Sequence, residues 1–139
     1  MPVRIARGRR LEEVEPGWLV ARAAAFPSVT LDVGAGDGRF ALQRAAEHPH
    51  ELVVAMDSSH DGMRESSSRA ARSPQRGGLD NVIFVVAALE AAPLELNGLA
   101  SLVTVHFPWG TLLDAAIGRD RAGAAHLAAM AAPGGLLRL

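Results

Sequence analysis

The sequence predicts an α/β domain whose mostly parallel sheet carries helices on both faces. Short apolar runs of strand length alternate along the chain with segments of helical length, and parallel strands need such crossovers. One of these runs leads directly into a glycine-rich turn and a helix over residues 29–40, an order typical of a nucleotide-cofactor loop. A chain of 139 residues can bury a sizeable core, so we expect a single domain.

Local patterns justify the first elements in turn. Residues 2–6 alternate in strand fashion, Gly8 lies in a turn, and residues 10–14 return as a second strand, which predicts a small hairpin. Pro16 then opens a helix, because its fixed backbone angle suits the first turn. This helix is expected to reach about Phe26.

The core sheet is expected over residues 28–139, after the basic hairpin of residues 1–15. Its helices are bounded by turn residues: His48-Pro49-His50 ends the first and Pro133-Gly134-Gly135 the last. The middle helix stops before Ser73-Pro74, because a residue that precedes proline disfavours helical geometry. The expected core strands are residues 29–33, 51–56, 82–86, 102–106 and 136–139. The expected core helices are residues 39–47, 61–72 and 120–132.

The glycine-rich turn is the most informative local motif. Gly34, Gly36 and Gly38 lack a Cβ, so the backbone can turn sharply and lie against a ligand. The helix that follows offers free N–H groups to a polar or anionic moiety. A dinucleotide fingerprint would need a small residue at position 39, and Arg39 there disfavours a dehydrogenase. The spacing found is acid-x-Gly-x-Gly-x-Gly, beginning at Asp32.

Acidic residues follow the next two core strands. Asp57 lies about 20 residues beyond the glycine loop, where an acid can bind both hydroxyls of a ribose. An aspartate after a strand is also an ordinary helix cap, so the pairing with the loop carries the argument. The backbone of Ala88 and Leu89 could meet an adenine ring, and Glu90 could reach a polar edge. The alternative for Glu90 is an ordinary acid at a helix start.

The charge is unevenly distributed although the net charge is only −1. All 14 basic residues are arginine, whose planar guanidinium suits phosphate. Residues 1–10 hold four arginines and no acid, and residues 64–76 hold four arginines and one acid, Glu65. These two basic patches suggest contacts with phosphate, and the alternative is solvated surface arginine.

Composition disfavours several classes of protein. The chain has no cysteine, hence no disulfide or thiolate metal site, and its five histidines show no clustered ligand spacing. Arg22 interrupts the apolar stretch behind the basic N-terminus, so a signal peptide is not expected. No stretch is long and apolar enough to span a bilayer. We expect a cytoplasmic monomer with neither a metal ion nor membrane contact.

Three segments together resemble a known family. They are Asp32-Val-Gly-Ala-Gly-Asp-Gly-Arg39, Pro74-Gln-Arg-Gly-Gly-Leu-Asp-Asn-Val-Ile-Phe-Val-Val-Ala-Ala88 and Phe107-Pro-Trp-Gly-Thr-Leu-Leu113. Over essentially its whole length the chain is similar to the aminoglycoside-resistance 16S rRNA (adenine(1408)-N(1))-methyltransferases, the kanamycin and apramycin resistance group. The glycine motif is generic to enzymes that use S-adenosylmethionine (SAM). The linker motif Pro-x-Arg-Gly-Gly-Leu-x-Asn of residues 74–81 and the Phe-Pro-Trp-Gly segment are far more specific to this family.

The resemblance implies a Rossmann-like class I methyltransferase sheet with SAM as cofactor and S-adenosylhomocysteine as product. It implies that the target is adenine 1408 of 16S rRNA in the 30S subunit, and that Trp109 stacks on this adenine after it has flipped out and positions it. The residues implied in the SAM pocket are Asp32, Gly34, Ala35, Gly36, Asp57, Ala88, Leu89, Glu90 and Thr111. The residues implied in rRNA contact are Arg7, Arg9, Arg10, Arg69, Arg72 and Arg76. Serines stand where relatives carry basic linker residues, at Ser67, Ser68 and Ser73.

The resemblance also implies two strands beyond Leu139. We therefore expect a sheet truncated after its fifth core strand, with that strand as an apolar edge; a compact five-stranded domain is the alternative. For function, the alternatives are another class I methyltransferase, acting on a different RNA or a small molecule, and a SAM-binding fragment of the rRNA enzyme without activity. The second stacking tryptophan of the family would lie in the missing part.

Overall fold

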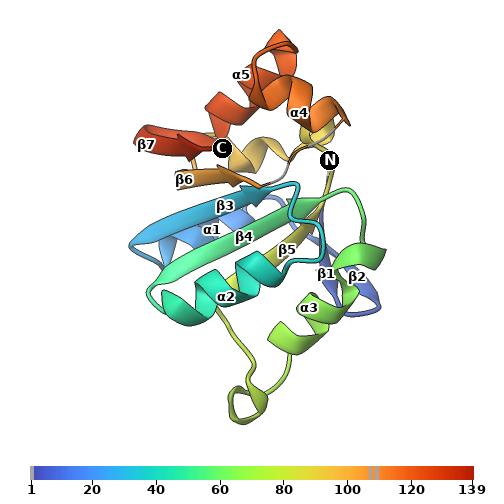
Figure 1. The fold of residues 1–139 in the computed structure, drawn as a ribbon. Coiled ribbons are helices and arrows are strands. Elements are labelled where there is room, and N and C mark those ends of the chain that lie inside the picture. Colours follow the sequence, from blue (N-terminus) through green and yellow to red (C-terminus); the bar gives the residue numbers. More distant parts are fainter. Residues whose placement is uncertain (1, 107, 109) are drawn as a thin grey trace.

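The computed structural model describes residues 2–106, 108 and 110–139. Within these residues the strands form one seven-stranded sheet of order β2-β1-β5-β4-β3-β6-β7 (Figure 1). The strands are β1 (Val3–Arg7), β2 (Arg10–Val14), β3 (Ser28–Val33), β4 (Glu51–Asp57), β5 (Val82–Val86), β6 (Ala100–Val105) and β7 (Ala131–Arg138). The helices are α1 (Trp18–Ala24), α2 (Arg39–Glu47), α3 (Arg64–Ala70), α4 (Gly110–Ala116) and α5 (Arg121–Met130), with 3-10 turns η1 (Asp61–Met63), η2 (Pro74–Arg76), η3 (Leu89–Ala91) and η4 (Leu94–Leu96).

Five neighbouring strands of the sheet, β5-β4-β3-β6-β7, run parallel to one another, as expected for strands joined by helical crossovers. The predicted hairpin is present, with Arg7 opposite Arg10 next to its turn. It joins the same sheet, because β1 pairs antiparallel with β5 through Ile5 and Val85. The expected α/β fold with an N-terminal hairpin is therefore confirmed.

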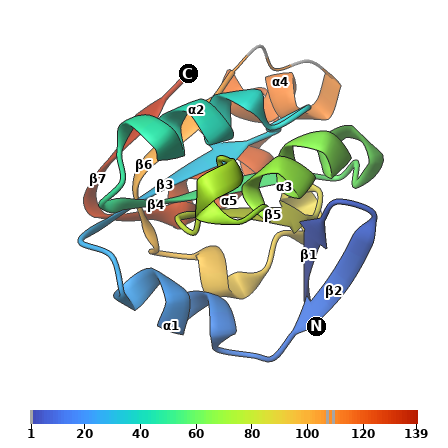
Figure 2. The same cartoon turned by 90° about the horizontal axis from the view of Figure 1, so that it is seen from below.

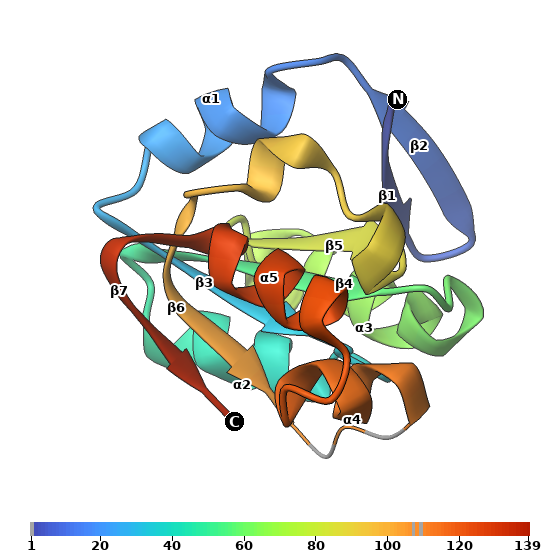
Figure 3. The same ribbon diagram turned by 90° about the horizontal axis from the view of Figure 1, so that it is seen from above.

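Helices cover both faces of the sheet (Figures 2 and 3). Successive strand residues point to opposite faces, so the sheet contributes to two separate cores. In one core, Leu31 of β3 packs with Leu19 of α1 and Leu127 of α5. In the other, Phe84 of β5 packs with Ala41 of α2. The helices α1, α4 and α5 thus lie on one face, and α2 and α3 on the other.

Two elements differ from the sequence prediction. Helix α4 was not predicted, because Gly110 and Thr111 extend a loop motif and carry no strong helix signal; Gly110 has a φ of +62°. Strand β7 begins at Ala131 and not at Leu136, so it includes the predicted turn around Pro133. Its pairing with β6 shifts register within this stretch. A proline lacks an N–H to donate, and an edge strand with such an irregularity accommodates it.

The β7 edge of the sheet is apolar and open among the described residues. Leu136 and Leu137 are 64% and 44% exposed, and β7 pairs only with β6 in the described part of the chain. The helix predicted over residues 61–72 is shorter, since it starts as η1 and continues as α3. None of the described helices is long and apolar enough to cross a membrane.

Candidate functional site

A cavity of about 970 Å³ opens at the carboxyl ends of β3, β4, β5 and β6. This edge is where ligands bind in open parallel sheets. The nine residues implied in a cofactor pocket all line it: Asp32, Gly34, Ala35, Gly36, Asp57, Ala88, Leu89, Glu90 and Thr111. The structure therefore brings together four segments that are far apart in the sequence.

The glycine loop is tied to the end of β4. The N–H groups of Gly34 and Ala35 both donate to the carbonyl of Met56, at 2.8 and 3.0 Å. Gly34 has a φ of +72°, and a Cβ there would lie 2.3 Å from Leu112 Cδ2 of α4. Gly36 has a φ of +60° and nothing within 4 Å of its Cβ position. Gly34 thus permits close packing by α4, while Gly36 leaves room beside the loop.

Asp57 holds this loop from the neighbouring strand. Its Oδ2 accepts a hydrogen bond from the Gly36 N–H and its Oδ1 accepts one from the Ser59 N–H, both at 2.9 Å. The Ser59 contact closes a turn after β4 and is not the helix cap that the sequence left as an alternative, since η1 has His60 at its N-cap and no side-chain cap. Each carboxylate oxygen has a second acceptor position, so Asp57 can still accept from ligand hydroxyls.

One of the N–H groups expected to be free at the start of α2 is already bound, and so is one in the loop before it. The backbone N–H of Arg39 donates to Asp37 Oδ1 at 3.0 Å, and the side-chain Nε of Arg39 donates to Asp37 Oδ2 at 2.8 Å. The Gly36 N–H is already bound to Asp57. The reason is that a carboxylate next to a helix N-terminus satisfies the unpaired amides and the helix dipole. An anionic ligand group therefore has less to bind here than the motif predicts.

The cavity wall is predominantly acidic. Its acidic side chains are Asp32, Asp37, Asp57, Glu90 and Asp120, whereas its basic or imidazole side chains are Arg39, His106 and His126. Arg39 is already paired with an acid. Such a wall suits a ligand that carries hydroxyls and positive charge, and it disfavours one with several phosphates.

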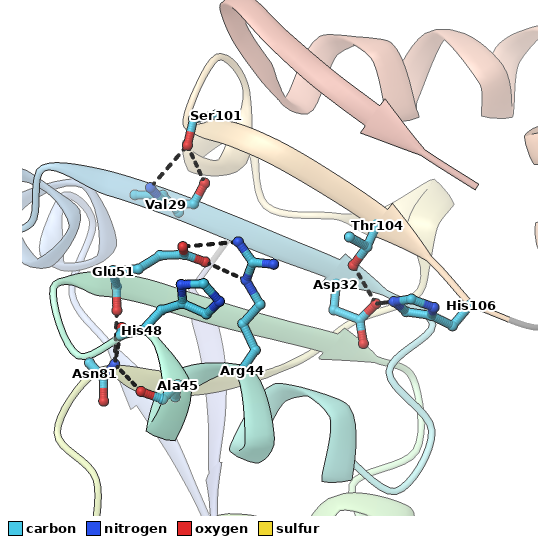
Figure 4. A network of polar contacts seen from close by, with 10 residues as sticks. All are labelled: Val29, Asp32, Arg44, Ala45, His48, Glu51, Asn81, Ser101, Thr104 and His106. Carbon is cyan, nitrogen blue, oxygen red and sulfur yellow. Dashed lines mark hydrogen bonds and ion pairs between the residues drawn. The ribbon is translucent and has the colours of Figure 1, made fainter.

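Asp32 is the buried acid of this wall, with only 2% of its surface exposed. Thr104 Oγ1 of β6 donates to Asp32 Oδ1 at 2.7 Å, and His106 Nε2 lies 3.9 Å from the same oxygen (Figure 4). Burial raises the pKa of Asp32, while the Thr104 hydrogen bond and the His106 ring oppose this rise. The residue is thus a carboxylate that is costly to ionise without a positively charged partner.

Helix α5 closes the other end of the cavity, which the sequence did not predict. It packs against η3, the turn that carries Leu89 and Glu90. Asp120 caps α5 by accepting from the Gly123 N–H at 3.1 Å, and His126 lies on the cavity wall. The N-cap signal of Asp120 is visible in the sequence. Nothing in the sequence shows that α5 returns to the strand ends.

Trp109, predicted to stack on a base, lies outside the described residues. Pro108 and Thr111, on either side of it in the chain, both line the cavity. Among the described residues, no group of three or more potential metal ligands occurs.

The two basic patches meet at the hairpin turn. The Gly8 N–H donates to Ser67 Oγ of α3 at 2.8 Å, and the Gly8 carbonyl lies 2.9 Å from His60 Nε2. These contacts bridge more than fifty positions of the sequence. As a result, the hairpin lies directly against the segment that begins the second patch.

The arginines of the patches share surface grooves. Arg9 lines a shallow groove with Arg64, and Arg7 lines another with Arg72. Arg7 Nε and Arg10 Nη2 also contact the Glu12 carboxylate, at 3.1 and 2.5 Å. Arg69, Arg72 and Arg76 are exposed. Of the six residues predicted to contact RNA, three lie on the hairpin (Arg7, Arg9 and Arg10) and three lie on or just after α3 (Arg69, Arg72 and Arg76). We call the hairpin and α3 together the hairpin–α3 surface.

The parallel sheet of order β5-β4-β3-β6-β7, its glycine loop after β3 and the acid after β4 define a class I methyltransferase domain. The family model described as NpmA, 16S rRNA (adenine(1408)-N(1))-methyltransferase, matches residues 4–139. The chain belongs to this family.

Individual relatives agree with this assignment. The chain is 32% identical over 117 residues to a 16S rRNA (adenine(1408)-N(1))-methyltransferase of Escherichia coli, a match that covers 84% of this chain and 53% of the relative. The crystal structure of the antibiotic-resistance methyltransferase Kmr is 39% identical with a TM-score of 0.91, over 96% of this chain and 68% of that one.

A mutant of the 16S rRNA (adenine(1408)-N(1))-methyltransferase from Catenulisporales acidiphilia, solved with its cosubstrate SAM, is 35% identical with a TM-score of 0.92. That match covers 99% of this chain and 67% of the other. The chain spans somewhat more than half the length of the curated rRNA methyltransferases it matches.

Proposed function

We propose that the cavity binds SAM and that this chain provides the catalytic core for methyl transfer to N1 of adenine 1408 in the 16S rRNA of the 30S subunit, which gives aminoglycoside resistance. The observation that carries the proposal is the acid-lined cavity at the carboxyl edge of the sheet, in a member of this family. The sulfonium and ammonium groups of SAM are positive, so they suit acidic walls better than a dinucleotide would.

The residues around the cavity fit the parts of SAM. Asp57 keeps acceptor positions for the two ribose hydroxyls. The backbone of Ala88 and Leu89 lies at the neighbouring strand end, where it would meet the adenine ring, with Glu90 near its polar edge. Asp32 would take the amino-acid portion, since it lies one strand further along. A relative solved with its cosubstrate SAM supports SAM as the ligand of this cavity.

The chemistry needs no general base. Adenine N1 has an in-plane lone pair and no proton at neutral pH, so it attacks the methyl group of SAM directly; the C–S bond breaks and the sulfonium becomes a neutral thioether. The protein must therefore bring two molecules together in the right orientation, which is worth about 7–11 kcal/mol. No acid–base pair has to be placed at the methyl group.

The target base must leave its stack before it can react. Flipping costs a few kcal/mol, and stacking on an aromatic side chain offsets about 1–3 kcal/mol of this cost. We assign this role to Trp109. The face of its indole would also favour the ring of adenine as it becomes positive.

The 30S subunit would dock on the hairpin–α3 surface. Guanidinium groups recognise the phosphates of folded RNA by shape and charge and not by base sequence. The arginines proposed for this role are Arg7, Arg9, Arg10, Arg69, Arg72 and Arg76. We propose further that the protein acts as a cytoplasmic monomer, where ribosomes are available to it.

Cofactor binding is tested first by calorimetry. The wild-type chain should bind S-adenosylhomocysteine and not NADH. An Asp57→Ala variant should lose most of this affinity, because it removes both the ribose acceptor and the anchor of the glycine loop. Binding of NADH, or no binding of S-adenosylhomocysteine, would refute the cofactor assignment.

Methyl transfer is tested on purified 30S subunits with labelled SAM. Modification at N1 blocks base pairing, so it should appear as a primer-extension stop at adenine 1408. Trp109→Ala should lower turnover while the affinity for S-adenosylhomocysteine is retained, and Trp109→Phe should restore part of the turnover. Binding of S-adenosylhomocysteine without any primer-extension stop would favour the alternative of an inactive SAM-binding fragment. A primer-extension stop at another nucleotide would favour a different RNA target.

The docking surface is tested separately by filter retention of labelled 30S subunits. Arg72→Glu should weaken binding and reduce its salt dependence, because a phosphate contact is lost. Arg119→Glu is the matched control, since Arg119 is an exposed arginine between α4 and α5, away from the hairpin. Equal effects of the two substitutions would argue against a specific surface.

A further inference from the structure

The two oxygens of Asp32 have different surroundings. Oδ1 accepts the hydrogen bond from Thr104 Oγ1 at 2.7 Å, and it is also the oxygen that His106 Nε2 approaches to 3.9 Å. Neither contact involves Oδ2 (Figure 4). Asp32 itself lines the cavity although it is 2% exposed. One oxygen is thus held by the protein and the other is left for a ligand.

His106 is held in place next to Asp32. Its ring lies against the ring of Phe40 of α2, with centroids 4.1 Å apart and planes inclined at 50°. Its Nε2 is buried and has no hydrogen-bond partner among the described residues. Leaving a buried nitrogen unpaired is costly, and a shift of about 1 Å would bring it within hydrogen-bond distance of Asp32 Oδ1. The carboxylate of Asp32 is therefore an acceptor that could satisfy it.

The topology places these residues at one end of the proposed cofactor. Thr104 and His106 belong to β6 and the residue just after it, on the side of β3 opposite β4. The proposed nucleoside contacts are Asp57, the last residue of β4, and Glu90, in η3 after β5. A ligand lying along the strand ends with its ribose at Asp57 would bring its amino-acid end to Asp32.

We propose that Thr104 and His106 are positioning residues that fix Oδ1 of Asp32 and so present Oδ2 to the ammonium group of the cofactor. This inference rests on the proposed function, since it needs SAM in the cavity. The pair makes this end of the cavity selective for a nucleoside that carries a cationic amino-acid group. Neither residue touches the transferred methyl group in this arrangement.

The test compares two ligands that share a nucleoside. S-adenosylhomocysteine carries the amino-acid group, and 5′-methylthioadenosine lacks it. Thr104→Val keeps the shape and removes the donor, and His106→Phe keeps a ring against Phe40 and removes the nitrogen. Thr104→Val should weaken binding of S-adenosylhomocysteine about tenfold in calorimetry, as expected for a lost hydrogen bond to a charged group. His106→Phe should weaken it by a smaller factor, because the nitrogen it removes lies 3.9 Å from Asp32 Oδ1. Each should leave the affinity for 5′-methylthioadenosine within about twofold of the wild-type value, because that ligand has no ammonium group that could bind the Asp32 carboxylate.

Two further variants separate positioning from general damage. Thr104→Ser keeps the hydroxyl that Thr104→Val removes, so it should bind S-adenosylhomocysteine as tightly as wild type. Ser101→Ala removes another hydroxyl of β6, one that bonds Val29 of β3 at the far end of the strand, and should change neither affinity. Equal losses for both ligands, or no loss in Thr104→Val, would overturn the positioning roles alone. A wild-type chain that bound neither ligand would overturn the proposed function as well.

Discussion

Asn81 offers the sharpest test of how the linker is held. It is 3% exposed, and its Nδ2 group donates to the carbonyls of Ala45, His48 and Glu51 at 2.9, 3.1 and 2.9 Å (Figure 4). Two of these carbonyls lie at the end of α2, where the last helix carbonyls lack a partner within the helix. That of His48 also accepts from the Glu51 N–H at 3.0 Å. The third lies at the start of β4. One side chain thus joins the end of a helix to the starts of two strands.

The expected cost of Asn81→Ala follows from these contacts. Two amide hydrogens are lost, each worth about 1 kcal/mol net, and buried carbonyls left without a donor add to this, for a total of about 2–3 kcal/mol. An unfolding entropy of about 2.1 cal/mol/K per residue applies to 139 residues. Each kcal/mol then lowers Tm by about 3–4 °C, so Asn81→Ala should lower Tm by about 7–10 °C.

Urea denaturation and calorimetry would measure this loss. The matched control is Asn97→Ala, because Asn97 is the other asparagine of the chain and is exposed. It should change Tm by no more than about 2 °C. A drop below about 3 °C for Asn81→Ala, or similar drops for both variants, would refute the argument from the three carbonyls.

Three other predictions concern the linker and the charged groups. Gly78→Ala should distort the linker and weaken 30S binding, because a Cβ would lie 1.6 Å from the Arg72 carbonyl; a filter-binding curve like that of wild type would contradict this. Asp32→Asn should abolish most S-adenosylhomocysteine binding yet raise Tm at pH 7. Burial raises the pKa of Asp32, so its ionisation costs stability as pH rises through that pKa, and the gain in Tm should shrink toward pH 4; a gain independent of pH would contradict the assignment. Glu51→Gln should lower Tm at pH 7 and have less effect at low pH. Burial alone would raise the pKa of Glu51, but its hydrogen bonds outweigh this and lower the pKa, so its contribution is lost as pH falls through the folded value; a loss that grew on acidification would refute this.

The sequence predicted the elements whose limits are set by local chemistry. The bounds of α2 match those predicted, because a glycine precedes it and His48-Pro49-His50 ends it. β5 matches as well, since its apolar run is bounded by polar residues and alanines. In contrast, the turn residues around Pro133 predicted a loop, and pairing with β6 overrides them. Tertiary contacts therefore decided the elements that the sequence misjudged.

The residues of the cavity also divide into those set by local sequence and those set by tertiary contacts. The loop glycines and Asp57 could be predicted, because their spacing reflects local backbone demands. His106, Thr104 and Asp120 could not, since their importance depends on which strand ends and helices meet. The linker motif shows a further limit of sequence reasoning: its asparagine is a buried structural residue.

The contacts of Gly8 with Ser67 and His60 hold the hairpin turn against α3 and the residues before it. They limit how the charge of the hairpin–α3 surface can change. Ser67, one of the three serines at which the family resemblance implies basic residues, is 2% exposed and accepts a hydrogen bond from the Gly8 N–H, so a lysine there would break this contact. Ser68 and Ser73 are exposed, and a lysine at either would add a cation to the proposed docking surface at little cost to the fold. Each phosphate contact made by such a cation would steepen the logarithmic salt dependence of RNA binding by a little under one unit, about 0.7–0.9. On the proposed docking surface, RNA affinity would thus be tunable stepwise at Ser68 and Ser73, while Ser67 holds the hairpin turn through its contact with Gly8.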